Sequence, residues 1–245
     1  GDERSLSDPS LMQVVERCGR IDHVGAPMTI AQGEVVAFHG PIESGRSIAR
    51  SIVVQMATWC GPADRQLVVV TASPTMWTWA DWLPHGGLAG PSAVIVVDAE
   101  SSSSDPGLAE GLETIDPARP TLVVTDRPSA FTARTGPLRR FLSSSGAAAL
   151  VVVDIGETVP AVCRRVLTVG STGSATWSGD VPASDDAVDI GFTGVSVGLA
   201  DTAARRLACL VDPEDAGGVG GGVPTSLSLS ELRPPSESSV DAIAD

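Results

Sequence analysis

The chain has 245 residues, of which 42% are hydrophobic and 4% aromatic, and its formal net charge is −14. This length and apolar content are enough for one large domain with a sizeable core. All 16 basic residues are arginines, so chemistry that depends on lysine, including the lysine of a phosphate-binding loop, is excluded. The acidic balance also disfavours a surface for duplex DNA or anionic membranes, because neutralising phosphates requires clustered positive charge.

The four cysteines are far apart in the sequence and form no CxxC pair: Cys18, Cys60, Cys163 and Cys209. Zinc and dithiol redox motifs are therefore not indicated, and no metal site is expected. We predict free, mostly buried thiols in a reducing compartment. No apolar run reaches the 18 residues that a membrane-spanning helix needs.

Apolar runs of strand length recur along the chain, each bounded by turn-forming residues. They cover residues 34–39, 66–71, 93–98, 121–126 and 149–154. The runs are continuous and rich in valine, which is typical of strands buried on both faces of a parallel sheet. Candidate helices alternate with them at 44–59, 107–116 and 137–145. The pattern predicts an α/β fold of the P-loop or RecA-like kind, with a mostly parallel sheet and helices on both faces.

The pattern changes after Asp154. Short apolar segments at 165–169, 174–178 and about 190–193 predict a small C-terminal β appendage of antiparallel strands or a hairpin. A helix is predicted over 195–210, with Ser196 as its N-cap. The chain therefore divides into a leader with a short helix (1–30), an α/β domain (31–212) and a linker rich in Gly, Pro and Ser (213–245).

A segment similar to a phosphate-binding loop follows the first predicted strand. Gly40-Pro41-Ile42-Glu43-Ser44-Gly45-Arg46-Ser47 precedes a helix and matches the strand–GxxxxGK[ST]–helix pattern, with Arg46 in place of the lysine. In such loops the glycines let backbone N–H groups wrap a phosphate, and Ser47 stands where a hydroxyl would bind magnesium. A planar guanidinium does not replace a compact ammonium well, and Glu43 adds negative charge where the anion would sit. We predict a vestigial loop, with nucleotide binding without turnover and active hydrolysis as the alternatives.

An ATPase also needs an acidic residue at the end of a nearby strand to bind magnesium. Asp98 fits loosely, with Glu100 close behind it, but Asp126 and Asp154 end strands equally well. Such aspartates often only cap the following turn. The predicted degenerate site therefore consists of Gly40, Gly45, Arg46, Ser47 and Asp98, and its cofactor, if it takes one, would be ATP with magnesium.

A tryptophan-rich segment follows the second predicted strand. Trp77-Thr78-Trp79-Ala80-Asp81-Trp82-Leu83-Pro84-His85 resembles the WxWxxWLPH segment of FtsK/SpoIIIE-like ATPases of the EccC/EssC kind, the motors of type VII secretion. In that family the segment belongs to an ATPase-like domain that precedes the first ATPase repeat. Further similarities follow in the family's order, at 159–163 (LPxxC), 193–208 (DGVS…ARxLAPL) and 223–232 (LPTSVSLLELL). The chain departs from the family pattern at Cys209, where the proline of LAPL is expected, and at Arg46.

The resemblance implies a non-hydrolysing regulatory or coupling domain at the cytoplasmic face of the plasma membrane, with no catalytic residue of its own. Membrane anchors before residue 1 and hydrolysing repeats after residue 245 would belong to the parent motor. Its expected partners are those repeats, secretion-complex subunits or a secreted protein, with a ring-like oligomer formed through the parent and no direct contact to nucleic acid. One alternative is an NTPase that uses Arg46, and another is a partner-binding module.

The partner-binding alternative rests on the Trp77–Trp82 surface and on His85. Tryptophan is a frequent anchor of protein interfaces, so these residues are candidate interaction residues. Helical spacing would place Trp79 and Trp82 on one face, with Trp77 to the side. The competing interpretation for the three tryptophans is packing within the core or between domains. For His85 it is local hydrogen bonding in a turn.

Overall fold

The computed structural model describes residues 29–85, 93–97, 106–170, 174–179 and 190–209. The helix predicted within the leader and the linker predicted at 213–245 lie outside the described residues, as do Cys18, Asp98 and Glu100.

The core of the molecule is a single sheet of eight strands in the order β3-β2-β4-β5-β1-β6-β7-β8. Taken along the chain, the strands are β1 (Val35–Gly40), β2 (Gln66–Thr71), β3 (Val94–Val96), β4 (Thr121–Thr125), β5 (Ala148–Asp154), β6 (Arg165–Val169), β7 (Ser174–Gly179) and β8 (Ile190–Gly191). The strands from β3 to β6 in the sheet order pair in parallel, whereas β7 pairs in the antiparallel sense with both β6 and β8. The predicted α/β class and mostly parallel sheet are confirmed.

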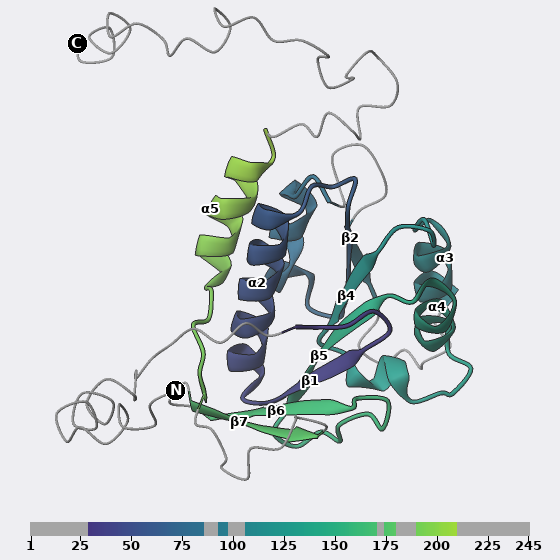
Figure 1. Cartoon of the computed structure of the whole chain (residues 1–245), viewed down its shortest axis with the longest axis vertical. Coiled ribbons are helices and arrows are strands. Elements are labelled where there is room, and N and C mark those ends of the chain that lie inside the picture. The colour runs from purple at the N-terminus through teal and green to yellow at the C-terminus, as the bar shows by residue number, and fades with distance from the viewer. Residues whose placement is uncertain (1–28, 86–92, 98–105, 171–173, 180–189, 210–245) are drawn as a thin grey trace, which may run out of the picture.

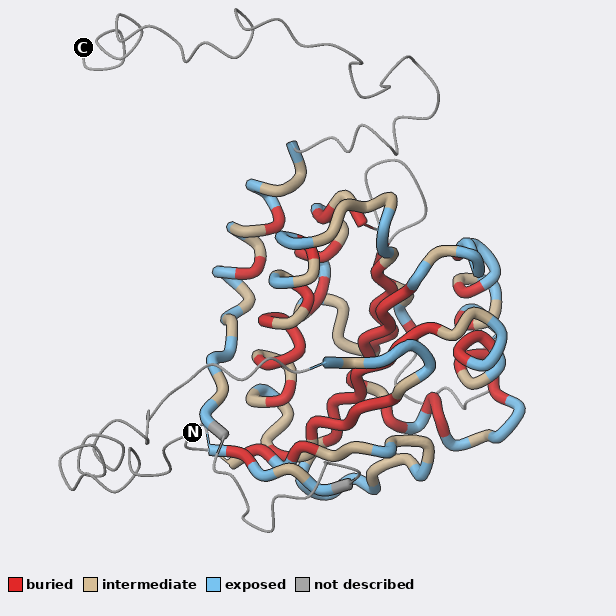
Figure 2. The backbone as a smooth tube through the Cα atoms, viewed as in Figure 1, coloured by how far each residue is buried: buried red, intermediate tan, exposed pale blue. Residues whose placement is uncertain are grey.

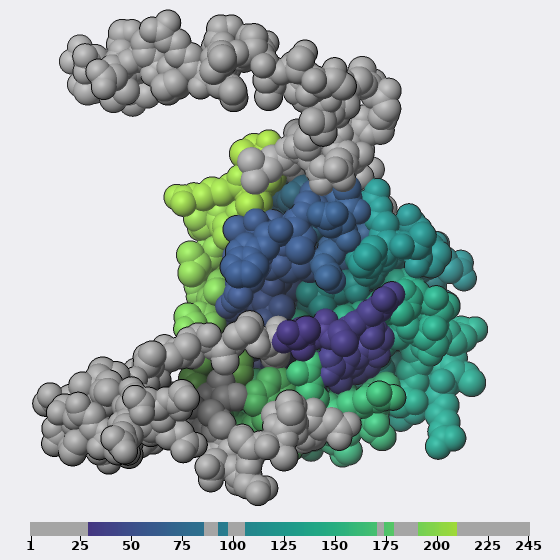
Figure 3. Space-filling view, in the orientation of Figure 1, coloured from purple at the N-terminus to yellow at the C-terminus, as the bar shows by residue number. Residues whose placement is uncertain are grey.

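Helices cover both faces of the sheet, as predicted (Figure 1). The long helix α2 (Ile42–Trp59) and the helix α5 (Val197–Leu207) lie on one face, and α3 (Pro106–Glu113) and α4 (Pro137–Ser145) lie on the other. In the space-filling view α5 runs along the outer side of α2 (Figure 3). The described part of the chain also contains the short 3₁₀ helices η2 (Pro74–Met76), η3 (Thr78–Trp82) and η4 (Pro128–Phe131).

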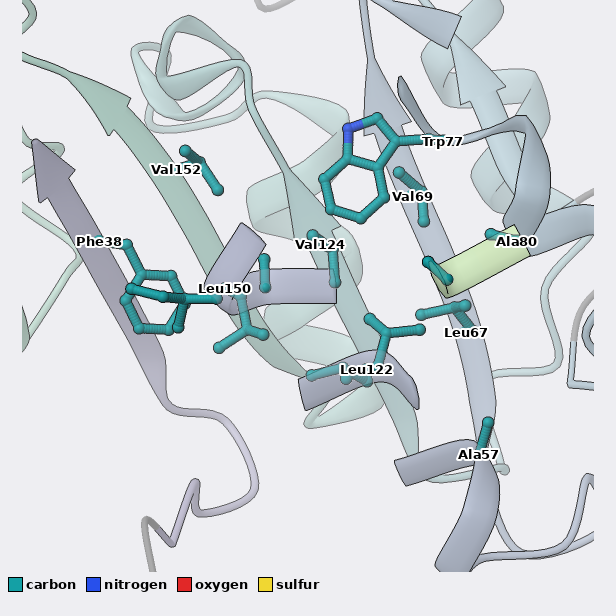
Figure 4. Close-up of a cluster of buried hydrophobic side chains, with 14 of the residues drawn as sticks. Phe38, Ala57, Leu67, Val69, Trp77, Ala80, Leu122, Val124, Leu150 and Val152 are labelled. Atoms are coloured by element: carbon teal, nitrogen blue, oxygen red, sulfur yellow. The ribbon is translucent and has the colours of Figure 1, made fainter. Parts of the chain in front are cut away.

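The central strands are buried on both sides because their successive side chains enter two separate hydrophobic layers. Phe38 and Leu150 pack in the layer under α2, whereas Ala37 and Val151 pack in the layer under α3 and α4. Figure 2 shows the strands as the most continuously buried part of the tube, and Figure 4 shows the layer under α2. This two-sided burial is why valine-rich runs, rather than alternating ones, form the sheet.

The antiparallel pairing predicted for the segments after Asp154 is present, but these strands extend the main sheet and do not form a separate appendage. β6 pairs in parallel with β1, and only β7 and β8 extend the sheet in the antiparallel sense. Leu167 and Val169 of β6 are 0% and 4% exposed in the layer under α2. A five-residue strand carries no mark in its sequence of the direction in which it pairs, so its partner is decided by packing.

Both ends of the predicted 195–210 helix shift inward in the structure. Ser196 is the N-cap of α5, as predicted, and its hydroxyl accepts a hydrogen bond from the Leu199 N–H at 3.3 Å. The helix ends at Leu207, and its inner side carries Ala200 and Ala204, both fully buried against the rest of the fold. These small side chains allow α5 to approach α2 closely.

An ion pair joins β6 to the turn that enters β1. The Arg165 guanidinium bonds both carboxylate oxygens of Glu34, one of them at 2.6 Å, and lies 5.5 Å from the centre of the Trp177 ring. Burial alone would raise the pKa of Glu34, but hydrogen bonds from Arg165 and the Ala31 N–H, with the Arg165 charge, hold that pKa below its ordinary value. This arrangement fixes the start of the central strand.

Candidate functional site

The segment that matches a phosphate-binding loop is helical almost from its start. β1 ends at Gly40, Pro41 is the N-cap, and α2 begins at Ile42, two residues before the predicted start at 44. The Gly45 N–H donates to the Pro41 carbonyl at 3.1 Å, and the Ile42 N–H donates to Asp154 Oδ1 at 3.1 Å. A regular first turn therefore stands where a loop of free N–H groups would wrap a phosphate.

Close packing accounts for both glycines of the motif. A Cβ on Gly40 would collide with the main-chain oxygen of Val169 in β6. A Cβ on Gly45 would lie 2.6 Å from Cγ1 of Val152, a fully buried residue of β5. The glycines thus let the turn and α2 approach the sheet, and this requirement exists without any ligand.

Gly45→Ala is expected to lower the free energy of unfolding by about 1–2 kcal/mol, because the clash with Val152 outweighs the better helix propensity of alanine. Urea unfolding followed by circular dichroism measures the change.

Gly198→Ala in α5 is the matched control, since a Cβ there meets nothing within 4 Å. It should leave stability unchanged or raise it by up to about 1 kcal/mol. Equal effects of the two substitutions would contradict the packing role of Gly45.

Arg46 lies at the centre of a buried polar cluster, where it pairs with Asp126, the residue that follows β4. Its Nε donates to Asp126 Oδ2 at 2.9 Å, and its NH2 lies 2.8 Å from the same oxygen and 3.2 Å from Ser73 Oγ. Trp77 Nε1 donates to that oxygen at 3.1 Å. The side chains of Arg46 and Asp126 are only 14% and 1% exposed, so water screens the pair weakly.

Among the three strand-terminal aspartates, the structure brings Asp126 to Arg46. Asp154 instead bonds the Ile42 and Ile155 N–H groups, as a turn-capping residue does, and Asp98 lies outside the described residues. The sequence did not favour Asp126 over Asp98 or Asp154. Only the strand order shows that β4 is separated from β1 by a single strand, β5. Asp126 Oδ1 is buried and has no hydrogen-bond partner within the described ranges.

Ser47 also forms hydrogen bonds within the fold. Its hydroxyl donates to the Ser44 carbonyl at 2.8 Å, and its own carbonyl accepts from the Val195 N–H at 2.9 Å. Gly194 lies against it so closely that a Cβ there would be 2.8 Å from the Ser47 Cβ. The hydroxyl that would bind magnesium in a working loop is therefore covered by the segment leading into α5.

A fully buried arginine fixes the same segment onto α2. Arg50 is 0% exposed; its Nε donates to the Val195 carbonyl at 2.8 Å, and its NH2 pairs with Glu43. Glu43, which the sequence places in the path of an anion, is thus the counter-ion of Arg50. Sequence reasoning missed Arg50, and an arginine on an otherwise apolar helix face was the available signal.

The four candidate interaction residues do not share a surface. Trp77 and Trp79 are 0% and 2% exposed, with ring centroids 6.1 Å apart, and they belong to the layer under α2. His85 is buried too, and its Nε2 lies 2.8 Å from the Cys60 carbonyl. Only Trp82 of the four is exposed, at 41%, with the Arg205 guanidinium 4.2 Å from its ring centre.

Other chemistry is sparse in the described part of the chain. Cys60, Cys163 and Cys209 are free thiols, as predicted, but Cys60 and Cys163 are only partly buried and Cys209 is exposed. Burial raises the pKa of the Cys163 thiol to about 12, although the nearby Arg139 charge opposes this, so Cys163 is not a nucleophile at neutral pH. Within the described ranges no three His, Cys, Asp or Glu side chains group as metal ligands, and no helix is long and apolar enough to cross a membrane.

Comparison with known proteins adds no family to these observations: no protein-family model matches the chain, and no curated protein matches it.

Proposed function

We propose that this chain is a non-hydrolysing, ATPase-like regulatory or coupling domain of a membrane-anchored FtsK/SpoIIIE-type motor for protein secretion. The observation that carries the proposal is the Arg46–Asp126 ion pair. In a working P-loop site a lysine contacts the phosphates and an aspartate holds magnesium. Here the two corresponding charges neutralise each other, so neither is available to a nucleotide.

The fold supports a P-loop or RecA-like origin for this arrangement. β1 lies inside a mostly parallel sheet, and the glycine-containing turn connects it to α2 at the carboxyl ends of the strands. Open α/β sheets bind their ligands at that edge. In this proposal the segment still lies where a nucleotide site would be, but its residues now serve packing and ion pairing.

The wider role is inferred from the ordered motifs that resemble EccC/EssC motors. Domains of such a motor would contact neighbouring ATPase repeats of the same chain, other secretion subunits or the secreted protein, at the cytoplasmic face of the membrane. Trp82, the exposed tryptophan of the Trp77–His85 segment, is with Arg205 the first candidate for such a contact. Buried Trp77 and Trp79 would support it from within.

Calorimetric titration of magnesium-ATP into the intact chain tests the proposal against the alternative of an NTPase or nucleotide sensor. We expect no binding heat from the wild type or from Arg46→Ala, because helical geometry and internal ion pairing both remove the phosphate site. A phosphate-release assay should likewise show no turnover.

Cooperative thermal unfolding of the same samples would establish that both proteins are folded. Micromolar binding by the wild type that Arg46→Ala abolishes would overturn the proposal and make the segment a nucleotide site.

A further inference from the structure

A pocket lies at the carboxyl edge of the sheet, on the face covered by α3 and α4. Two loops form it, one following β4 (η4 and Thr132) and one following β5 (157–161), together with the first turn of α4. Its volume is about 460 Å³, which suits a small organic molecule. The carboxyl ends of adjacent parallel strands are a frequent place for ligand sites in open α/β sheets.

The pocket wall contains an arginine that forms no ion pair with the residues that the structure describes. Arg139 lines the pocket, and its Nε is shielded from solvent yet has no hydrogen-bond partner in the part of the chain that the structure describes. None of the ion pairs formed by described residues involves Arg139. Because no described carboxylate pairs with the guanidinium, its positive charge is available to an anionic ligand in the pocket.

Two further features favour an anion beside Arg139. The residue lies in the first turn of α4, which starts at Pro137 and contains no acidic residue in that turn, so the helix dipole is not already neutralised. Thr158 and Ser129 add hydroxyl groups to the lining. The rest of the wall is mainly apolar and includes Phe131, Val159 and Pro160.

We propose that this pocket binds a small organic monocarboxylate, with its carboxylate on Arg139 and its apolar body against Val159 and Pro160. A guanidinium matches the planar carboxylate with two parallel donors. Glu157 also lines the pocket, and its Oε2 accepts from the Asp154 N–H at 3.2 Å. Its negative charge favours a singly charged ligand with an apolar body over a doubly charged phosphate.

Titration of benzoate into the ¹⁵N-labelled intact chain, followed by amide chemical shifts, tests the proposal. We expect saturable shifts that map to residues 128–132, 136–140 and 157–161, with a dissociation constant of roughly millimolar order for so small a probe. Benzamide, which has the same shape and no charge, should bind about tenfold more weakly or worse.

Arg139→Gln should weaken benzoate binding by about tenfold or more, whereas Arg140→Gln, on the same helix but outside the pocket lining, should leave it unchanged. Ala161→Trp offers a second test, since a large side chain on this exposed wall residue should fill the pocket and block benzoate. Absent shifts, shifts centred elsewhere, equal binding of benzamide, tighter binding of inorganic phosphate, or an Arg139→Gln protein that binds like the wild type would each overturn the proposal.

Discussion

Asp126→Ala should lower the free energy of unfolding by about 3–5 kcal/mol, the cost typical of removing one partner from a buried ion pair. The substitution leaves the Arg46 guanidinium, which is 14% exposed, without its counter-ion, and it leaves the buried Trp77 Nε1 without its acceptor. Chemical denaturation followed by circular dichroism measures the loss. A carboxylate in an open magnesium site would behave differently. Its removal would take away an unpaired negative charge, whereas here the removal of Asp126 leaves the positive charge of Arg46 unpaired.

A double-mutant cycle separates the ion pair from the general cost of altering the core. Replacing both partners, as in Arg46→Met with Asp126→Leu, should recover much of the loss, because neither charge is then buried alone. Asp126→Asn should fall between the wild type and Asp126→Ala, since its amide oxygen still accepts from Trp77. A loss below about 0.5 kcal/mol for Asp126→Ala would contradict the structural role of the pair.

The strands were predictable because two-sided burial leaves a direct trace in the sequence. The run 66–71 has the same bounds in the structure, and 149–154 differs by one residue, since each is an unbroken apolar stretch ended by a polar residue. The pairing of β6 was not predictable in the same way. Its side chains suit either direction, and the deciding contacts, with β1 and with α2, come from distant parts of the chain.

The position of the candidate site was predictable from the sequence, but its helical conformation and the ion pair of Arg46 were not. Spacing located the segment correctly at the junction of β1 and α2, where Gly40 ends the strand and Gly45, Arg46 and Ser47 lie in the first turns of the helix. It did not reveal that helix starts at Ile42, because the fit depends on how close Val152 and Val169 lie to the glycines. The partner of Arg46 was hidden for the same kind of reason, since 80 residues separate it from Asp126 in sequence.

Trp77→Ala should cost about 3–5 kcal/mol, as truncations of large buried aromatic side chains do. The ring is 0% exposed and lies near Val69 and Val124 in the layer under α2 (Figure 4). Trp77→Phe keeps most of the apolar volume but removes the Nε1 donor to Asp126, so it should cost less, about 1–3 kcal/mol. Denaturant midpoints of the two variants, measured by circular dichroism, separate packing from the hydrogen bond.

Trp82→Ala is the control that distinguishes a core role from a contact role within the same segment. Trp82 is 41% exposed and stacks with Arg205 across 4.2 Å, an arrangement worth about 1 kcal/mol or less at an exposed site. Its loss should therefore barely change the stability of the isolated chain, while Trp77→Ala changes it greatly. If Trp82→Ala destabilised the chain as much as Trp77→Ala, the ring would be part of the core. The only exposed tryptophan of the Trp77–His85 segment would then no longer be a candidate contact with a neighbouring repeat.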